Sequence, residues 1–160
     1  MVSKFYLPRL ELTMSGIIGG AGSRSGVIGR DPAFGRVVRT AGNLTTTSTS
    51  LVDVTGATVT FTTGAFPVAY GVAQAGWNNT INAANRFNVD IDGTLQHGSI
   101  GIQVNQPTAG YRVNYSFSGQ SVALSAGSHT IKLQWSVNSG TGTLECGSVS
   151  SNLFYAHEIR

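Results

Sequence analysis

Alternation of apolar and polar residues predicts short β-strands along most of the chain. The clearest case is RFNVDIDGTLQ (86–96), where every second residue from Phe87 to Ile91 is apolar and the residues between them are polar. A period of two places successive side chains on opposite faces, so this pattern is typical of a strand with one buried face. Asp92 and Gly93 follow, and this pair favours the positive φ angles of a type I′ turn. The segment is therefore a predicted hairpin.

Other segments carry related patterns. LVDVTGATVTFTT alternates from Ala57 onward, and YRVNYSF places Tyr, Val, Tyr and Phe on one face. FPVAYGVAQAGW is apolar almost throughout, as a strand buried on both faces is. QSVALSAGSHTIKLQWSV predicts two strands joined at residues 125–128, with Ile131, Leu133 and Trp135 facing inward. The predicted strand segments are 51–63, 66–77, 86–96, 99–105, 111–117, 120–137, 143–149 and 152–159.

These patterns predict an all-β protein. About eight or nine short strands at roughly 8–12-residue spacing indicate a jelly-roll-like antiparallel β-sandwich. The composition agrees, because Gly, Ser, Thr, Asn and Val are abundant and only 11% of the residues are charged. Long helices normally draw on runs of Glu, Lys, Leu, Ala and Arg, and the sequence contains no such run.

The first 40 residues show neither the period of two of a strand nor the 3.6-residue period of a helix. They form a predicted extended arm, which is followed by the β-domain at 41–160. Within the arm, SGIIGGAGSRSGVIG (15–29) contains Ser-Gly-Ile-Ile-Gly and Ser-Gly-Val-Ile-Gly, ten residues apart, and six glycines. Glycine makes a local fold entropically costly, whereas burying each large aliphatic side chain contributes roughly 1.5–3 kcal/mol. We therefore expect the arm to dock on another subunit or on a neighbouring protein. The expected docking residues are Ile17, Ile18, Arg24, Val27, Ile28 and Arg30.

Positive charge is concentrated in this arm. Residues 1–40 contain six basic and two acidic residues, a net charge of +4, whereas residues 41–160 have a net charge of −1. A basic arm can contact nucleic acid or a membrane. These charges, however, are dispersed among glycines and aliphatics and are not clustered as a phosphate-binding segment requires. An acidic protein surface is the better match, and nucleic acid is disfavoured as a partner.

The sequence predicts synthesis in the cytoplasm without secretion. Cys146 is the single cysteine, which excludes an intrachain disulfide. The N-terminal apolar stretch is interrupted by Pro8, Arg9 and Glu11, so it does not match a secretory signal. No window approaches the uncharged apolar length that a membrane span requires, so no membrane insertion is expected.

Motifs of catalysis or metal binding are not evident. His97, His129 and His157 lie on separate predicted strands without metal-ligand spacing. Asp90–Gly93 matches the start of a calcium loop, but the later acidic ligand is missing, so a hairpin turn is the better interpretation. There is no G-x-S-x-G motif, and GGAGSRSG lacks the Gly-Lys-Ser/Thr ending of a phosphate-binding loop. We predict a protein that is not an enzyme and takes no cofactor or metal.

Aromatic residues leave carbohydrate binding as an alternative. Tyr111, Tyr115 and Trp135 fall on predicted inward faces, so we expect them in the core. Trp77 lies in GWNNT, among polar turn residues, and is the one candidate for an exposed ring. The candidate ligand-binding tip is Trp77, Asn78 and Asn79, with the loops Asn105–Gly110 and Asn138–Gly142 as further candidates.

Several segments together resemble structural proteins of viruses that infect bacteria. SGIIGGAGSRSGVIG followed by TTTSTSLVDVTGATVTFTTG resembles virion proteins of tailed bacteriophages, especially aquatic ones. NVDIDGT and ALSAGSHTIKLQW are similar to the trimeric jelly-roll heads of fibres and decoration proteins of such phages. The resemblance implies a homotrimeric jelly roll displayed on a virion and attached by its arm, and it implies no catalytic residue.

Two functions follow as expectations. In the first, the protein is a decoration (cement) or short fibre protein that its arm anchors to capsid or tail. In the alternative, it is a receptor-binding fibre head that recognises a glycan on the host surface. The elaborate arm and the modest, weakly charged loops favour the first. A Gly-rich surface with few charges would make a poor soluble monomer, which favours a homo-oligomer, with a trimer expected.

Overall fold

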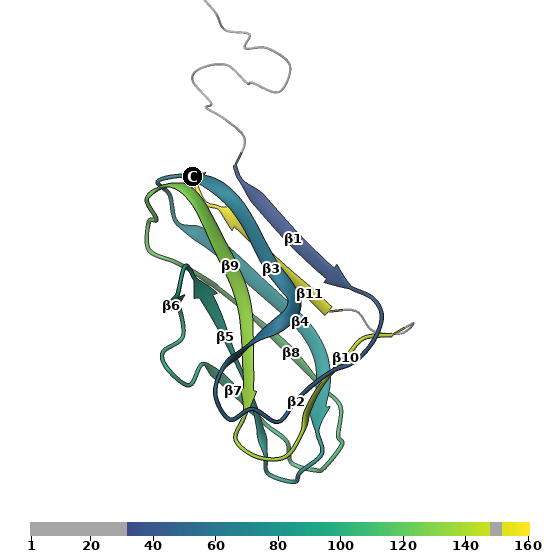
Figure 1. Ribbon diagram of the computed structural model, residues 1–160. Coiled ribbons are helices and arrows are strands. Elements are labelled where there is room, and N and C mark those ends of the chain that lie inside the picture. The colour runs from purple at the N-terminus through teal and green to yellow at the C-terminus, as the bar shows by residue number, and fades with distance from the viewer. Residues whose placement is uncertain (1–31, 148–151) are drawn as a thin grey trace, which may run out of the picture. The chain divides into compact units, whose positions relative to one another are not determined.

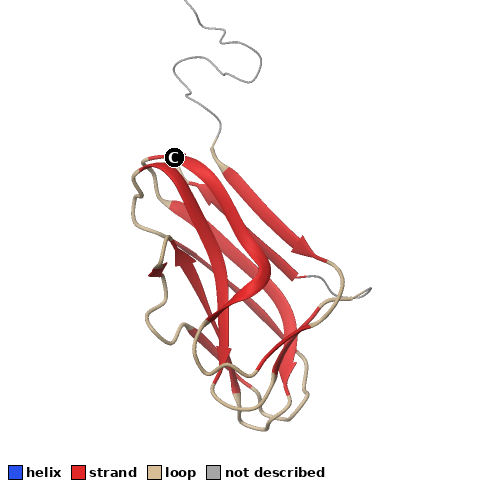
Figure 2. Ribbon diagram, in the orientation of Figure 1, coloured by secondary structure: helices blue, strands red, loops and turns tan. Residues whose placement is uncertain are grey.

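The computed structural model describes residues 32–147 and 152–160. Within these ranges the regular secondary structure consists of β-strands (Figures 1 and 2). The arm residues expected to dock, between Ile17 and Arg30, lie outside these ranges. The strands are β1 (Phe34–Arg39), β2 (Leu44–Thr46), β3 (Val52–Gly64), β4 (Val68–Asn78), β5 (Ala84–Ile91), β6 (Thr94–Leu95), β7 (Ile102–Asn105), β8 (Val113–Gln120), β9 (Ala126–Val137), β10 (Gly142–Glu145) and β11 (Asn152–Glu158).

Two antiparallel sheets form a sandwich. In the first sheet, β4 is central: β8 pairs along one of its edges, and β11 and β10 pair in succession along the other. β1 then pairs with β11, and β2 pairs with β10. In the second sheet, β9 lies between β3 and β5, and β6 and β7 share the far edge of β5. The predicted all-β, jelly-roll-like antiparallel sandwich is confirmed.

The core lies between the sheets and follows the period of two. On β9, Ile131, Leu133 and Trp135 are buried, as the alternation predicts. The predicted hairpin is also present, because β5 and β6 pair antiparallel and Asp92 and Gly93 have φ angles of 50° and 87°. The largest fully buried side chains are Tyr70, Tyr115, Phe87, Phe154, Ile131, Leu133 and Leu144.

Two expectations about the strands around β8 are corrected. Tyr111, expected to face inward, lies before β8 begins and is 59% exposed. Its backbone N–H donates to Thr108 O at 3.2 Å, so the chain is still in a turn there. Residues 121–124, expected to be a strand, belong to an irregular connection, and residues 126–128, expected to join two strands, already lie in β9. The main-chain groups of residues 121–124 bond instead to the segment before β4, since Leu124 N donates to Phe66 O at 3.2 Å.

The first strand comes from the segment predicted to be arm. Phe34–Arg39 pairs with β11 in continuous register, so the predicted boundary at residue 40 falls after β1. β1 passes close to the facing sheet: a Cβ at Gly35 would lie 2.9 Å from Val59 Cβ. Only glycine fits this approach without displacing its neighbour. A six-residue edge strand that contains glycine and two arginines has too weak an apolar alternation to be recognised from its sequence.

Candidate functional site

Three loops meet at one end of the sandwich, the lower end in Figure 1. They are residues 79–83, 106–112 and 138–141, which connect β4 to β5, β7 to β8 and β9 to β10. Asn79 N donates to Thr141 O at 3.0 Å, and Gly110 N donates to Asn78 O at 2.7 Å. The structure therefore brings the predicted Trp77–Asn79 tip together with both of the loops named as further candidates.

The side chain of Asn78 holds this loop end together through hydrogen bonds. It is buried, and its amide Nδ2 donates to Asn85 Oδ1 at 3.2 Å and to Ser139 O at 3.1 Å. Its Oδ1 accepts from Thr80 N at 3.0 Å. The neighbouring Asn79 is exposed, and its Oδ1 accepts from Thr141 N at 2.8 Å. The two asparagines thus hold the loops in place with most of their hydrogen-bonding groups.

Trp77 is half-buried and its ring is paired with a cation. The guanidinium carbon of Arg112 lies 5.8 Å from the centre of the ring, which is within the range of a cation–π contact. Glu145, which is nearly buried, forms an ion pair with Arg112 and orients it. Arg112 therefore occupies one of the ring faces on which a sugar could stack. The exposed ring at the loop end is that of Tyr111, next in the chain to Arg112, which the sequence pattern had assigned to the core.

The three histidines lie apart, with different partners. Among the residues that the structure describes, no three His, Cys, Asp or Glu side chains gather as metal ligands would. His129 Nδ1 lies 2.5 Å from Asp92 Oδ2, and its Nε2 lies 2.9 Å from Ser125 O. The hydrogen bond with Asp92, and then that with Ser125 O, raise the pKa of His129. Both nitrogens are engaged, so this His–Asp pair has no free nitrogen to accept a proton from a substrate.

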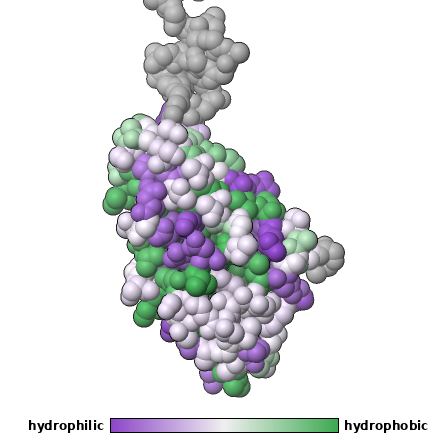
Figure 3. Space-filling view, in the orientation of Figure 1, coloured by the Kyte–Doolittle hydropathy of each residue, from purple (hydrophilic) through white to green (hydrophobic). Residues whose placement is uncertain are grey.

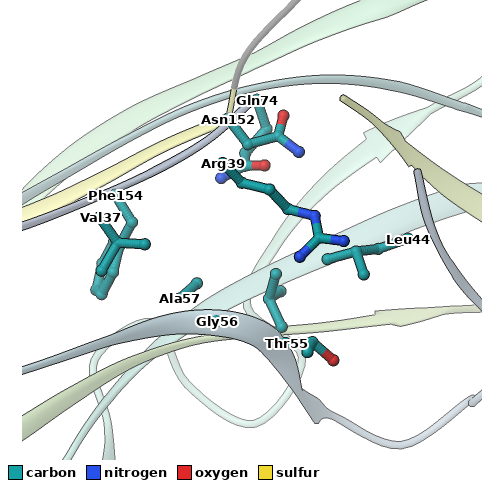
Figure 4. Close-up of a pocket in the computed structure, with 10 residues that line it drawn as sticks. Val37, Arg39, Leu44, Thr55, Gly56, Ala57, Gln74, Asn152 and Phe154 are labelled. Atoms are coloured by element: carbon teal, nitrogen blue, oxygen red, sulfur yellow. The ribbon is translucent and has the colours of Figure 1, made fainter. Parts of the chain in front are cut away.

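A pocket opens between the sheets at a point where both are interrupted (Figure 4). In the first sheet, residues 40–43 separate β1, which pairs with β11, from β2, which pairs with β10. In the second, the pairing of β3 with β9 shifts register between Asp53 and Thr58. The space inside it measures about 10 Å³, which is room for about one water molecule. Its lining is Val37, Arg39, Leu44, Val54, Thr55, Gly56, Ala57, Gln74, Asn152 and Phe154.

Three polar side chains face this pocket from three strands. Gln74 on β4 and Asn152 on β11 are 4% and 5% exposed, and Gln74 Oε1 and Asn152 Nδ2 have no hydrogen-bond partner. Arg39, at the end of β1, is directly opposite Asn152 in the β1–β11 register. Its Nε donates to Gly42 O at 3.0 Å, and no carboxylate in the described part of the chain forms an ion pair with it. Sequence reasoning missed this cluster because its members are far apart in the chain.

Two solved structures that this chain resembles are distant from it in sequence. No family model matches the chain, and no curated protein matches it. A structure of dimeric latent PorU from Porphyromonas gingivalis is 8% identical with a TM-score of 0.43, covering 80% of this chain and 13% of that chain. A structure of infectious bursal disease virus, Gx strain, is 11% identical with a TM-score of 0.41, covering 80% of this chain and 36% of that one. The chain thus spans a small part of either protein, and similarity this distant indicates no function. Within the described residues, no helix is long and apolar enough to cross a membrane.

Proposed function

We propose that the protein is a structural component of a tailed-phage virion, a homotrimeric decoration or short fibre protein. Its N-terminal arm fastens it to a capsid or tail protein, and the β-sandwich is the displayed domain. The duplicated Ile and Val anchors of residues 15–29 support this, because a glycine-rich segment cannot bury them by itself. The main supporting observation is that the chain directly after the arm is firmly attached to the sandwich.

The start of the described chain is fastened to the last strand. Glu158, at the end of β11, is buried, and its Oε2 accepts from Ala33 N at 3.2 Å. Its own backbone N–H donates to Ala33 O at 2.8 Å. Its Oε1 accepts from Arg160 Nε at 3.1 Å and from Gly64 N at 3.4 Å. One buried carboxylate therefore ties together the beginning of β1, the end of β3 and the C-terminal residues.

β1 continues this attachment along its whole length. Its six residues pair with Asn152–His157 in unbroken register. Antiparallel hydrogen bonds run perpendicular to the strands, so a pull along the strand axis loads all of them together. A domain held on a particle by its N-terminal arm needs such a junction, because each bond alone is weak.

The outer side of β1, the strand that follows the arm in the chain, has exposed apolar residues. Phe34 is 60% exposed and Val38 is 39% exposed, and both lie on the face of β1 turned away from the core. The outer face of the other sheet is different: hydrophilic side chains gather over β9 and β3 (Figure 3), where Lys132 Nζ donates to Asp53 Oδ2 at 2.9 Å. We propose that the apolar side of β1 contacts the same particle protein that holds the arm, because β1 follows the arm in the chain.

The experiment compares anchor variants on particles stripped of the protein. A full-length variant with Ile17, Ile18, Val27 and Ile28 changed to Ser is tested beside Val122→Ser, a control that removes an exposed aliphatic residue from the sandwich. We expect only the anchor variant to lose rebinding and to leave the particle's Tm unchanged on addition. Any variant truncated to remove the arm should begin at Pro32, so that it keeps β1. Normal rebinding of the anchor variant would refute the proposed role of the arm.

Trimer formation has its own measurement. Analytical ultracentrifugation of the full-length protein at micromolar concentration should give three times the mass of one chain. A stable monomer would contradict the oligomeric part of the proposal and leave the role of the arm to the rebinding experiment.

The loop end supports a second candidate function, a receptor-binding fibre head. The exposed Tyr111 ring beside the Arg112–Trp77 pair offers an aromatic surface with polar neighbours, which suits a glycan. If this function holds, residues 32–160 alone should bind host cells, and Tyr111→Ala should abolish that binding while Val122→Ser does not. Binding to particles but not to cells would exclude it.

A further inference from the structure

A larger pocket lies on the outer face of the second sheet. Its floor is formed by Arg86 on β5 and Ser136 on β9, which are directly opposite each other in the register of the two strands. Both side chains lie on the face turned away from the core, because their chain neighbours Phe87 and Trp135 are buried inside the sandwich. The space above this floor measures about 330 Å³, which is within the size range of small-molecule sites.

Two loop segments form the walls of this pocket, and both are held against the strands. Residues 49–51 follow Ser48, whose carbonyl oxygen accepts from Val137 N on β9 at 2.8 Å. Residues 99–100 precede Gly101, where a Cβ would lie 2.2 Å from a backbone carbonyl oxygen of β5. Backbone contacts therefore position both walls, and the pocket is formed before any ligand enters it.

The guanidinium of Arg86 has no acidic partner in the described part of the chain. Lys132, which β9 places on the same face, is instead paired with Asp53. Arg86 Nε donates to Gln103 Oε1 at 3.1 Å, and Gln103 Nε2 donates in turn to Asn105 Oδ1 at 2.9 Å. These two hydrogen bonds orient the guanidinium and leave its terminal nitrogens as donors for a ligand.

Ser136 adds a buried hydroxyl beside this cation. Its side chain points outward from the sheet, yet the residue is only 2% exposed because the walls enclose it. Its hydroxyl forms no hydrogen bond with any residue that the structure describes. Buried polar groups nearly always have a partner, so a hydroxyl left open toward a pocket indicates that a partner comes from outside the chain.

The lining defines the chemistry of that partner. A guanidinium binds a carboxylate through two parallel hydrogen bonds, which suits Arg86 to an acid. The hydroxyl groups of Ser136 and Ser99 both donate and accept, as the hydroxyl groups of a sugar do. Ile100 at the rim is 55% exposed and offers an aliphatic surface to C–H groups. A sugar ring that carries a carboxylate satisfies all of these groups, whereas inorganic phosphate has no apolar surface for Ile100.

We propose that this pocket binds an acidic sugar residue, such as a uronic acid, of a polysaccharide. Its carboxylate pairs with Arg86, a ring hydroxyl bonds with Ser136, and its C–H groups lie against Ile100. Because the rim residues 49–50 and 99–100 are exposed, the rest of the polysaccharide extends into solvent. The site uses no residue of the docking anchors or of the loop end, so it stands apart from both proposed functions.

The test is a titration of the full-length protein followed by ¹⁵N NMR at constant ionic strength. Glucuronate is the probe, glucose is the matched sugar without the carboxylate, acetate is the carboxylate without the sugar, and inorganic phosphate is the competing anion. We expect saturable shifts of the Arg86 Nε signal and of the Ser99 and Ile100 backbone amides, with glucuronate binding several-fold more tightly than the other three. Equal binding of acetate or glucose, or tighter binding of phosphate, overturns the assignment to an acidic sugar. Shifts that do not saturate overturn the site.

Variants separate this pocket from general charge effects. Arg86→Gln should weaken glucuronate binding by about tenfold or more. Arg36→Gln removes the same charge from the outward face of β1, in the other sheet, and should leave binding unchanged. If Arg86→Gln does not fold, Gln103→Glu serves instead, because it keeps the shape of an exposed side chain and places a competing carboxylate against Arg86. Glucuronate binding that is unchanged in Arg86→Gln or in Gln103→Glu overturns the proposal.

Discussion

Replacing Glu158 with Gln tests how firmly the start of β1 is held. The change keeps the shape of the side chain but removes its charge and turns one oxygen acceptor into an NH₂ donor. The bond from Arg160 then loses its anionic acceptor and is no longer an ion pair, and a backbone N–H of Ala33 or Gly64 faces another donor. Losing a charge-assisted bond costs about 1.5–3 kcal/mol and a buried unpaired N–H costs about 1–3 kcal/mol. With partial relaxation, we expect the free energy of unfolding to fall by about 3 kcal/mol.

The pH dependence of this effect follows from the carboxyl group. Burial raises the pKa of Glu158, but hydrogen bonds from Arg160 and from the Ala33 and Gly64 amides outweigh it and hold the pKa below its ordinary value. A carboxyl with a lowered pKa in the folded state stabilises the protein above its unfolded pKa. That stability is lost as the pH falls through the folded pKa. The difference between wild type and Glu158→Gln should therefore be full at pH 7 and shrink in acid.

The assay is urea unfolding followed by circular dichroism, with a thermal melt in parallel. A loss of about 3 kcal/mol corresponds to a Tm lower by roughly 10 °C for a domain of this size. Asp53→Asn is the matched control, since it breaks an exposed ion pair with Lys132, a type of pair worth about 0–1 kcal/mol. Amide exchange at Ala33 should also accelerate in Glu158→Gln. A loss no larger than that of Asp53→Asn, or one that does not diminish in acid, would refute this account of the junction.

Three further outcomes are expected from unfolding measurements. Tyr115→Phe should lower the free energy of unfolding by about 2–4 kcal/mol, because the buried hydroxyl accepts from Asn85 Nδ2 at 2.6 Å and from Gln106 Nε2 at 3.0 Å and both donors would lose it. The pKa of His129 is raised in the folded protein, so its charged form adds stability that is complete below its unfolded pKa and is lost as the pH rises through its folded pKa. His129→Gln should therefore lower the free energy of unfolding more at pH 6 than at pH 9. Gly76→Ala should lower the free energy of unfolding by about 1–3 kcal/mol or more, because the new Cβ would lie 2.1 Å from a backbone carbonyl oxygen of β10. A lower Tm is the measured result.

The amino-acid sequence by itself determined the class of fold and most of the strands. The alternation in β9 marked Ile131, Leu133 and Trp135 as inward, and all three are buried. The Asp92–Gly93 pair marked the turn of the β5–β6 hairpin, where both residues have positive φ. These features are local: side-chain period and turn chemistry act within a few residues and need no knowledge of the partner strand.

Only the tertiary structure decided which separate segments come together. Arg39, Gln74 and Asn152 form one pocket because β1, β4 and β11 are neighbours in a sheet, and nothing in their local patterns records that pairing. The bond from Ala33 to Glu158 spans 125 positions of the chain. β1 itself was assigned to the arm, because an edge strand depends on a distant partner for its hydrogen bonds. Strand order and register are set by burial across the whole sandwich, which a one-dimensional pattern does not contain.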